Sequence, residues 1–302
     1  METSILHQCT LCDNSDLDPV DPESDITRCR VCGYIFHNPQ PSQKQLFEFY
    51  SRPTQYDSWL EALESRDRLW KRRLGKLVSR RKTGSLLDVG TGIGQFLSIA
   101  RNSYSPVHGT EVSRTALQIA KQRYGLDLYE GTIEDLKLEG KHFDNITLFH
   151  VLEHVPDPRC TIRTCYSLLN KGGILVIAIP NQVTSLRSFW RRGLMAIGLR
   201  KKEGAGKLGL RPISMSATTD EIHLSYFTPR VMHELLEKSG FSIISSTLDP
   251  FYVANGMQKV KEDLYYFFCL TVRYIFKINI YDALLVISRK NDAADSNVSR
   301  VA

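Results

Sequence analysis

Four cysteines near the N-terminus have the spacing of a metal site. Cys9 and Cys12 form one C-x-x-C pair, and Cys29 and Cys32 form a second pair 16 residues further along. The two-residue gap lets both sulfurs of a pair point at one ion, and four thiolates complete the tetrahedral shell of Zn2+. The alternatives are a redox dithiol or two unrelated pairs, and the double spacing favours zinc over both.

This N-terminal segment also needs a metal for its own stability. A stretch of about 45 residues rich in Asp and Pro cannot build a core alone, so a bound ion would supply part of its folding energy. We therefore predict a zinc ribbon over residues 1–45. The other cysteines, Cys160, Cys165 and Cys269, lie in periodic apolar segments and are expected to be buried thiols.

A glycine-rich turn forms the second candidate site. It follows a short apolar strand at 85–89 and reads Asp88-Val-Gly90-Thr91-Gly92-Ile-Gly94. Such a turn between a parallel strand and a helix lets the backbone approach a ligand closely. The G-x-G-x-G spacing differs from the G-x-G-x-x-G of dinucleotide sites, and no lysine follows as in a P-loop. An acid two residues before the first glycine would repel a pyrophosphate, so we expect a different ligand.

The elements around this turn predict an α/β fold. Strands are expected at 107–112, 126–132, 143–151 and 174–180, with helices at 114–124 and 158–169 between them. Alternation at this spacing is typical of a doubly wound, mostly parallel sheet, which binds ligands at the carboxyl ends of its strands. Glu111 ends the second strand, where a carboxylate can accept two hydrogen bonds from a ribose diol. Helices at 42–50 and 57–82 form most of a connector over 46–84.

At this point the sequence resembles the class I S-adenosylmethionine-dependent methyltransferases. The matching stretches are LLDVGTGIGQFL (86–97), HGTEVS (108–113), GTIEDL (131–136), FDNITLFHVLEHVPDP (143–158), LLNKGGILVIAIPN (168–181) and HLSYFTPRVMHELLEKSGF (223–241). The branch it looks closest to is that of the ubiquinone-biosynthesis O-methyltransferases. The resemblance implies a Rossmann-like, seven-stranded sheet over residues 85–290, ending in an antiparallel hairpin of 241–248 and 283–290.

The resemblance also implies roles for individual residues. The methionine part of S-adenosylmethionine would lie on the turn of Asp88, Gly90, Thr91, Gly92 and Gly94. Glu111 would bind the ribose hydroxyls, Ile133 and Glu134 would flank the adenine, and His150 would face the sulfonium. Many relatives place an Asp at the position of Thr132, so the adenine contact is expected either to be weaker or to come from Glu134.

Methyl transfer to a hydroxyl or amine needs in-line positioning and a base near the methyl group. The candidates are His150, His154 and His223, with His150 expected to lie closest to the reaction centre. Structural roles are the alternative: His154 can brace the 153–156 loop, and His223 can pack beneath the sheet edge. His150, Glu153 and His154 also occupy positions that bind a divalent metal in some relatives, where the first residue is Glu. A loop-stabilising role is favoured, because His replaces that Glu here.

The net charge of +6 is unevenly distributed. Residues 66–82 contain nine Lys and Arg against one Asp, and residues 184–211 contain eight against one Glu. Two basic zones indicate an anionic partner or surface. In the first zone, however, Trp70, Leu74 and Leu77 recur at helical spacing, which favours a helix with solvated basic residues on its other side.

The second basic zone lies in an insertion at 184–222. Leu186, Phe189, Trp190, Leu194 and Ile197 fall on one helical face, with Arg187, Arg191 and Arg192 beside it. This composition suits a helix at a membrane surface, a lid over an anionic or lipid-linked acceptor, or a helix packed by its apolar face. A second insertion at 249–282 is aromatic-rich and suggests a lid, and 291–302 is expected to be a disordered tail.

The sequence carries no signal-peptide pattern and no apolar run of the roughly 20 residues that a membrane span requires, so we expect a cytoplasmic protein. The resemblance implies methylation of a small-molecule acceptor, at a hydroxyl of a sugar, phenol or lipid-linked precursor. A ribosomal RNA methyltransferase is the alternative, because a zinc ribbon and basic zones could serve RNA. Nucleic acid is disfavoured, since the ribbon offers only Tyr34 and Phe36 for base stacking. A non-catalytic cofactor-binding protein is disfavoured by the intact turn and Glu111.

Overall fold

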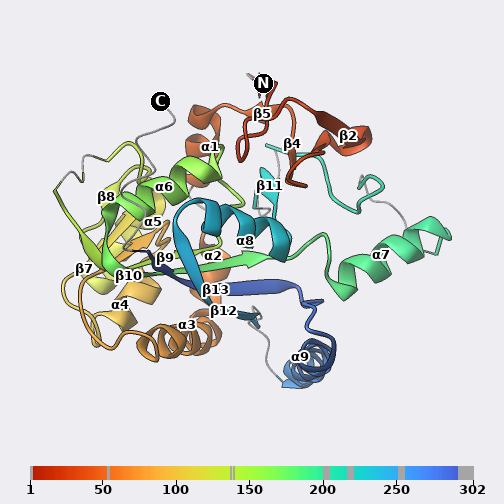
Figure 1. The fold of residues 1–302 in the computed structure, drawn as a ribbon. Helices are drawn as coiled ribbons and strands as arrows, with labels where there is room; N and C mark the ends of the chain where they lie inside the picture. Colours follow the sequence, from red (N-terminus) through yellow and green to blue (C-terminus); the bar gives the residue numbers. More distant parts are fainter. Residues whose placement is uncertain are drawn as a thin grey trace.

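A computed structural model of the chain describes residues 3–52, 55–136, 138, 140–199, 205–215, 221–250 and 256–291. The apolar runs read from the sequence form the central sheet (Figure 1). Its strands are β6 (Leu86–Val89), β7 (Val107–Glu111), β8 (Tyr129–Glu130), β9 (Phe143–Phe149), β10 (Leu169–Pro180), β12 (Phe241–Leu248) and β13 (Ala283–Lys290).

The sheet is mostly parallel and has the order β12-β13-β10-β9-β6-β7-β8. Strand β13 runs antiparallel to both of its neighbours, β10 and β12, and the remaining pairs are parallel. The predicted doubly wound fold with a terminal antiparallel hairpin is confirmed. In such a sheet the carboxyl ends of β6, β7 and β9 meet at one edge, where a ligand site is expected.

Helices cover both faces of this sheet. One face packs on α6 (Pro158–Leu168) and α8 (Pro229–Lys238), and the other packs on α3 (Leu63–Val78), α4 (Gln95–Ala100) and α5 (Arg114–Tyr124). The short helices α1 (Gln43–Tyr50) and α2 (Asp57–Glu61) precede α3. The predicted helix at 57–82 is therefore interrupted at Ala62 and ends at Val78.

The N-terminal module packs on the main domain and shares a sheet with it. Strands β2 (Leu17–Asp21), β3 (Ile26–Cys29) and β4 (Ile35–His37) form a sheet with β11 (Ser225–Tyr226), which lies much later in the chain. A 3-10 helix at Pro22–Ser24 joins β2 to β3, and β1 (Thr3–Ser4) pairs with β5 (Gln40–Pro41). Buried cysteines of the module share one apolar core with residues of α8. The module is thus continuous with the main domain across β11.

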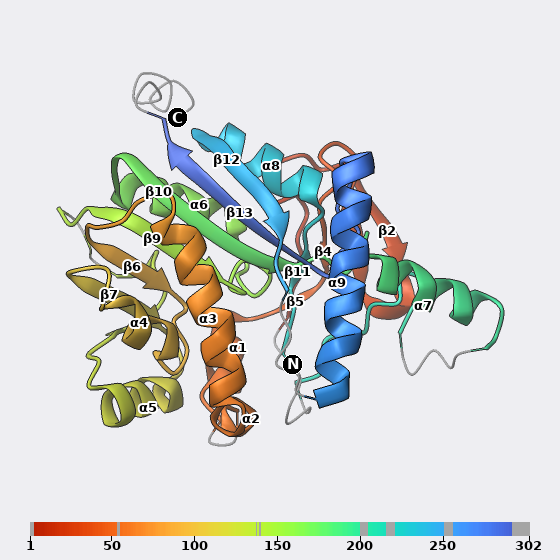
Figure 2. The same ribbon diagram turned by 90° about the horizontal axis from the view of Figure 1, so that it is seen from below.

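Each insertion contains a helix outside these two layers. They are α7 (Leu186–Ala196), in the basic insertion, and α9 (Gly256–Phe276), in the second insertion. Both lie at the end of the molecule away from α4 and α5 (Figure 2). Arg187 of α7 pairs with Glu262 of α9 at 2.7 Å, which holds the two helices together. Of the predicted tail at 291–302, residues 292–302 lie outside the described residues.

Several details differ from the sequence prediction. Strand β8 is limited to two residues, because this edge strand meets β7 only at Thr110 and Glu111. Strand β10 begins early, at Leu169, which pairs with Phe143 ahead of an irregular stretch. Cys160 is exposed rather than buried, because it lies on the outer side of α6.

The largest difference concerns the first basic zone. Arg66 and Arg73 were expected on a solvated face of α3, but both are buried. Arg73 is 0% exposed and lies inside the domain with an acidic partner. The prediction of a purely solvated basic face was wrong, because an arginine can take an inward position when a long-range carboxylate compensates its charge.

Candidate functional site

A cavity of about 180 Å³ opens at the carboxyl ends of β6, β7 and β9. Of the predicted site residues, Gly90, Gly92, Glu111, Ile133, Glu134, His150 and His154 line it. Asp88, Thr91 and Gly94 do not line it, although they belong to the same turn. His223 is not a lining residue either, but its ring lies 4.9 Å from that of His154.

The glycine turn has the backbone that its sequence predicted. Gly90, Gly92 and Gly94 all have positive φ, between +58° and +80°. A Cβ on Gly90 would lie 2.6 Å from a methyl carbon of Val151, so only glycine fits where the turn meets the cavity. A Cβ on Gly94 would instead meet Leu126 and Ala120. Gly90 therefore shapes the cavity wall, whereas Gly94 lets the turn pack on the domain interior.

Glu111 is buried at the end of β7, and backbone groups hold its carboxylate. Its Oε2 accepts a bond from the Gly92 amide at 2.7 Å, and its Oε1 accepts from Val112 and Ser113, both at 2.9 Å. Burial raises the pKa of Glu111, and these three amides oppose that rise. The carboxylate is thus fixed toward the cavity before any ligand arrives, as a ribose-binding group should be.

Asp88 lies deeper, at the end of β6. Its Oδ1 accepts a hydrogen bond from the Thr147 hydroxyl at 2.5 Å. Burial raises the pKa of Asp88 to about 7, against the lowering effect of that bond. Asp88 therefore lies behind the turn, where a cationic group bound at the turn would favour its charged form without direct contact.

The predicted adenine end is formed by residues 131–134. Ile133 is buried against the sheet, and Glu134 accepts a hydrogen bond from the Thr161 hydroxyl. The Thr132 hydroxyl donates to Asp135 at 2.8 Å. Thr132 and Glu134 both line the cavity, and the Thr132 hydroxyl is engaged within its own loop.

His150 is held from two sides. It follows β9 with φ +59°, and its amide donates to the Ala178 carbonyl at 2.8 Å. One ring nitrogen, Nδ1, lies 3.2 Å from Glu153, and the other, Nε2, lies 2.9 Å from the Arg73 guanidinium. Because a guanidinium can only donate, Nε2 acts as an acceptor and Nδ1 as a donor. Both nitrogens are engaged, which makes His150 a positioned wall residue and a poor proton acceptor.

Arg73 anchors this arrangement. Its Nε and Nη2 contact one carboxylate oxygen of Asp249 at 2.9 and 2.5 Å, and both side chains are 0% exposed. Burial alone would raise the pKa of Asp249, but the Arg73 guanidinium holds it below the usual range. The pair connects α3, the end of β12 and the His150 ring.

His154 and His223 form a second cluster with two carboxylates. His154 Nδ1 lies 2.6 Å from the Ile222 carbonyl and 2.9 Å from the Tyr50 hydroxyl, so Nδ1 carries the proton. His154 Nε2 then presents its lone pair, 3.9 Å from Glu153. His223 is oriented in the same way, with Nδ1 at 3.0 Å from the Gln182 amide oxygen and Nε2 at 3.8 Å from Glu221.

The two histidines differ in basicity. Burial lowers the pKa of His154, although Glu153 acts against this. For His223 burial also opposes the charge, but the carboxylates of Glu221 and Glu153 raise its pKa. The imidazole of His154 therefore stays neutral down to a lower pH than the imidazole of His223 does. It also lines the cavity, as Glu221 does.

The same cluster has the composition of a cation site. Glu153, His154 and His223 each offer one ligand atom, and these atoms lie within 4.8 Å of one another. His150 is not part of this group, because its ring contacts Arg73. The set of His150, Glu153 and His154 considered from the sequence is therefore not the one that the fold brings together.

Sequence reasoning missed most residues that the connector contributes to the cavity. Trp59 and Arg66 line it, and the guanidinium of Arg66 lies 3.6 Å from the centre of the Trp59 ring. Arg66 is buried, and among the described residues its Nε has no hydrogen-bond partner. It is therefore suited to a carboxylate ligand. Tyr50 and Tyr56 also line the cavity. Helical periodicity gave no signal for these roles.

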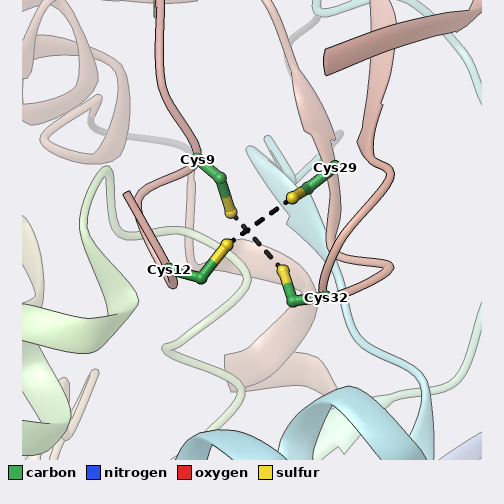
Figure 3. A group of neighbouring side chains, drawn as sticks. All are labelled: Cys9, Cys12, Cys29 and Cys32. Carbon is green, nitrogen blue, oxygen red and sulfur yellow. Dashed lines mark hydrogen bonds between the residues drawn. The ribbon is translucent and has the colours of Figure 1, made fainter. Parts of the chain in front are cut away.

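The four predicted metal ligands converge (Figure 3). The sulfurs of Cys9 and Cys32 lie 3.6 Å apart, as do those of Cys12 and Cys29, and all four lie within 4.8 Å of one another. Sulfurs at about 2.3 Å from a zinc ion in tetrahedral geometry are about 3.8 Å apart. The cluster therefore fits a zinc ion without rearrangement.

Comparison with known proteins identifies the family. A family model described as "Methyltransferase domain" matches residues 62–246, and the chain belongs to this family. A ubiquinone biosynthesis O-methyltransferase of Haemophilus ducreyi is 35% identical over 107 residues, covering 32% of this chain and 45% of the relative. Its counterpart in Coxiella burnetii is 32% identical over 102 residues, covering 32% and 44%. The chain thus spans less than half the length of these relatives.

Solved structures confirm the fold. A methyltransferase of Thermotoga maritima, named S-adenosylmethionine-dependent, aligns with a TM-score of 0.50 at 17% identity, covering 82% of this chain and 100% of that one. The magnesium protoporphyrin IX methyltransferase of Synechocystis, solved with bound S-adenosylhomocysteine, aligns with a TM-score of 0.50 at 14% identity, covering 82% and 99%. The chain has the Rossmann-like methyltransferase fold.

Proposed function

We propose that this protein transfers a methyl group from S-adenosylmethionine to a hydroxyl of a small-molecule acceptor, such as a sugar, a phenol or a lipid-linked precursor. The observation that carries the proposal is the cavity itself. One wall presents the preset carboxylate of Glu111 and the Gly90 turn, and the same cavity is lined by His150 and His154. S-adenosylmethionine, when bound, supplies a methyl group on a positively charged sulfur. The chain supplies the walls, the orientation and the base.

We assign the base role to His154. Its Nδ1 proton is fixed on the Ile222 carbonyl, so its Nε2 lone pair is available to take the hydroxyl proton. Glu153 lies on the Nε2 side and would stabilise the imidazolium that forms. His150, whose nitrogens contact Glu153 and Arg73, would position the acceptor side of the cavity instead. This differs from the sequence-based expectation, which ranked His150 first.

Basic residues near the cavity favour an anionic acceptor. A second hollow of about 730 Å³ lies between the end of β10, α7 and α9 and is lined by Arg187, Trp190 and Arg191, among others. Gln182 also lines this hollow and contacts His223, so the hollow adjoins the histidine cluster. A phosphate of a nucleotide sugar or a lipid-linked sugar is the kind of group that arginines hold there.

Ribosomal RNA methylation is the weaker candidate. Base stacking needs exposed aromatic rings. Tyr34 and Phe36, the two aromatic residues of the ribbon considered for this role, are each 1% exposed and pack on the main domain. We propose instead that the ribbon binds a structural zinc ion through Cys9, Cys12, Cys29 and Cys32.

A turnover assay tests the proposed function. The purified protein is incubated with S-adenosylmethionine and a panel of nucleotide sugars, lipid-linked sugars and phenols, and S-adenosylhomocysteine is measured. Formation with one acceptor class, and none with ribosomal RNA, supports the proposal. Formation with RNA alone would contradict it.

The base assignment is tested with the accepted acceptor. His154→Asn is expected to lower kcat by about 10²–10⁴-fold, and the matched variant of an exposed histidine, His142→Asn, should change little. Burial lowers the pKa of His154, so this side chain is protonated only at pH values below the usual histidine pKa. As pH decreases, the wild-type rate should therefore fall only below that usual pKa. A different outcome would favour a cation at Glu153, His154 and His223. In that case a chelator of divalent ions would abolish turnover while zinc is retained, and added Mg2+ would restore it.

A further inference from the structure

Helix α9 presents its apolar side to solvent. Its inner face is partly polar, with Glu262, Tyr265 and Cys269 turned toward the domain. Its outer face is apolar: Met257, Leu264 and Phe267 are 72%, 66% and 59% exposed. The helices of globular proteins normally show the reverse pattern, with the apolar stripe toward the core. Packing among the residues that the structure describes therefore does not account for the outer face of α9.

The exposed apolar residues continue onto α7. We define the α7–α9 face as the exposed large apolar side chains of both helices and the residues that follow each: Phe189, Trp190, Ile197, Leu199, Met257, Val260, Leu264, Phe267, Phe268, Leu270, Tyr274, Ile275, Phe276 and Ile278. Arg187 joins the two helices through Glu262, and its guanidinium lies 4.0 Å from the centre of the Tyr265 ring. Both views place these helices at the same end of the molecule (Figures 1 and 2).

The charges around this face are of one sign. Residues 186–199 contain three arginines and no acid, and residues 256–278 contain four Lys and Arg against two acids. Both of those acids are already paired, Glu262 with Arg187 and Asp263 with Lys259. Lys261 and Lys277 are exposed, and neither has an acidic partner among the described residues. The face is therefore apolar with a basic margin.

We propose that the α7–α9 face docks on the surface of an anionic lipid bilayer. An interfacial helix places its apolar side chains in the headgroup region, aromatic residues occupy the boundary, and Lys and Arg contact the anionic lipids. Helix α9 has 21 residues, which gives about 30 Å of helix to lie along the surface. No helix among the described residues has the length and apolarity to span a bilayer, so the contact is peripheral.

A second copy of this chain is the competing occupant. The basic margin argues against it, because two copies facing each other would bring Lys261 and Lys277 toward like charges, whereas an anionic surface complements them. The proposal does not depend on the acceptor or on turnover, so it can fail while the proposed function stands, and the reverse also holds.

Vesicle co-sedimentation tests the proposal. The full chain should sediment with vesicles of phosphatidylcholine and phosphatidylglycerol, bind phosphatidylcholine vesicles much more weakly, and lose binding as salt is raised. Leu264→Ser/Phe268→Ser should weaken binding by at least about tenfold, because two exposed side chains lose their insertion. Lys261→Glu/Lys277→Glu should weaken binding to anionic vesicles specifically. The matched control on α5, Lys121→Glu/Arg123→Glu, should bind as the wild type does.

Calorimetric binding of S-adenosylmethionine and thermal melting show whether each variant is folded, since none of these positions lies at the cavity. Failure of the wild-type chain to bind anionic vesicles overturns the proposal. So does binding that the α9 variants leave unchanged. Light scattering that shows a dimer in the wild type and a monomer in Leu264→Ser/Phe268→Ser, without vesicle binding, would assign the face to a second copy.

Discussion

The buried ion pair of Arg73 and Asp249 should be a major determinant of stability, and substitution of either partner tests this. Both side chains are 0% exposed, and two of the arginine nitrogens share one carboxylate oxygen. Removing Arg73 leaves the Asp249 charge in an apolar interior, where the other carboxylate oxygen already lacks a hydrogen-bond partner among the described residues. Breaking one partner of such a pair typically costs about 3–5 kcal/mol.

The double variant gives the magnitude of the coupling. Arg73→Met/Asp249→Leu removes both charges and keeps much of the volume, so it should be less destabilised than either Arg73→Met or Asp249→Leu alone. The guanidinium also packs over Phe149, 4.8 Å from the ring centre, and Met retains part of that contact. Urea unfolding of the four proteins, followed by circular dichroism, yields the free energies of unfolding and the coupling energy.

The pH dependence supplies an independent check. Arg73 holds the pKa of Asp249 below its usual value, so the folded chain binds this proton less tightly than the unfolded chain does. The stabilisation is therefore complete above the unfolded pKa of about 3.9 and is lost as pH falls through the lower folded pKa. A cost below about 1 kcal/mol for Arg73→Met, with an unchanged acid-unfolding profile, would refute a buried pair.

Three further predictions concern the proposed ligand sites. Glu111→Ala should weaken S-adenosylmethionine binding by about 1.5–3 kcal/mol in calorimetry, because a charged acceptor for the ribose hydroxyls is lost, and an unchanged dissociation constant would mean that the ribose lies elsewhere. Asp88→Asn should weaken the same binding yet raise the melting temperature above about pH 7. The raised pKa of Asp88, about 7, makes wild-type stability fall as pH rises from about 3.9 to that value. Equal pH profiles of the melting temperature in the two proteins would exclude this. Cys29→Ser/Cys32→Ser should lose one zinc per chain in metal analysis and melt at lower temperature, and full zinc content would contradict the assignment.

Several elements have the bounds that were expected from the sequence. Helix 114–124 was expected from the alternation of strands and helices, and the strands 241–248 and 283–290 were expected from the family resemblance. Gly90 and Glu111 were also correctly located at the cavity, because a glycine turn and a strand-terminal acid are short-range signals.

The sequence could not predict the pairings that join distant segments. Arg73 and Asp249 are 176 residues apart, and nothing around Arg73 distinguishes it from the solvated arginines of the same helix. Likewise, the outward apolar face of α9 was read as an aromatic-rich lid, because composition does not tell which side of a helix meets the domain. Nothing in the sequence indicated the contact between Arg73 and the His150 ring, on which the proposed base role of His154 depends.

The same long-range order connects the N-terminal module to the histidine cluster. Strand β4 of the module pairs with β11, which begins at Ser225, two residues after His223. The amides of Leu224 and Ser225 both donate to the Glu153 carbonyl, at 2.7 and 3.2 Å, so this segment also contacts the loop after β9 that carries Glu153 and His154. Zinc bound by the four cysteines would stabilise β4 and, through β11, the segment that carries His223. The cysteine module therefore supports the histidine side of the cavity, whereas Glu111 lies at the end of β7 in the central sheet.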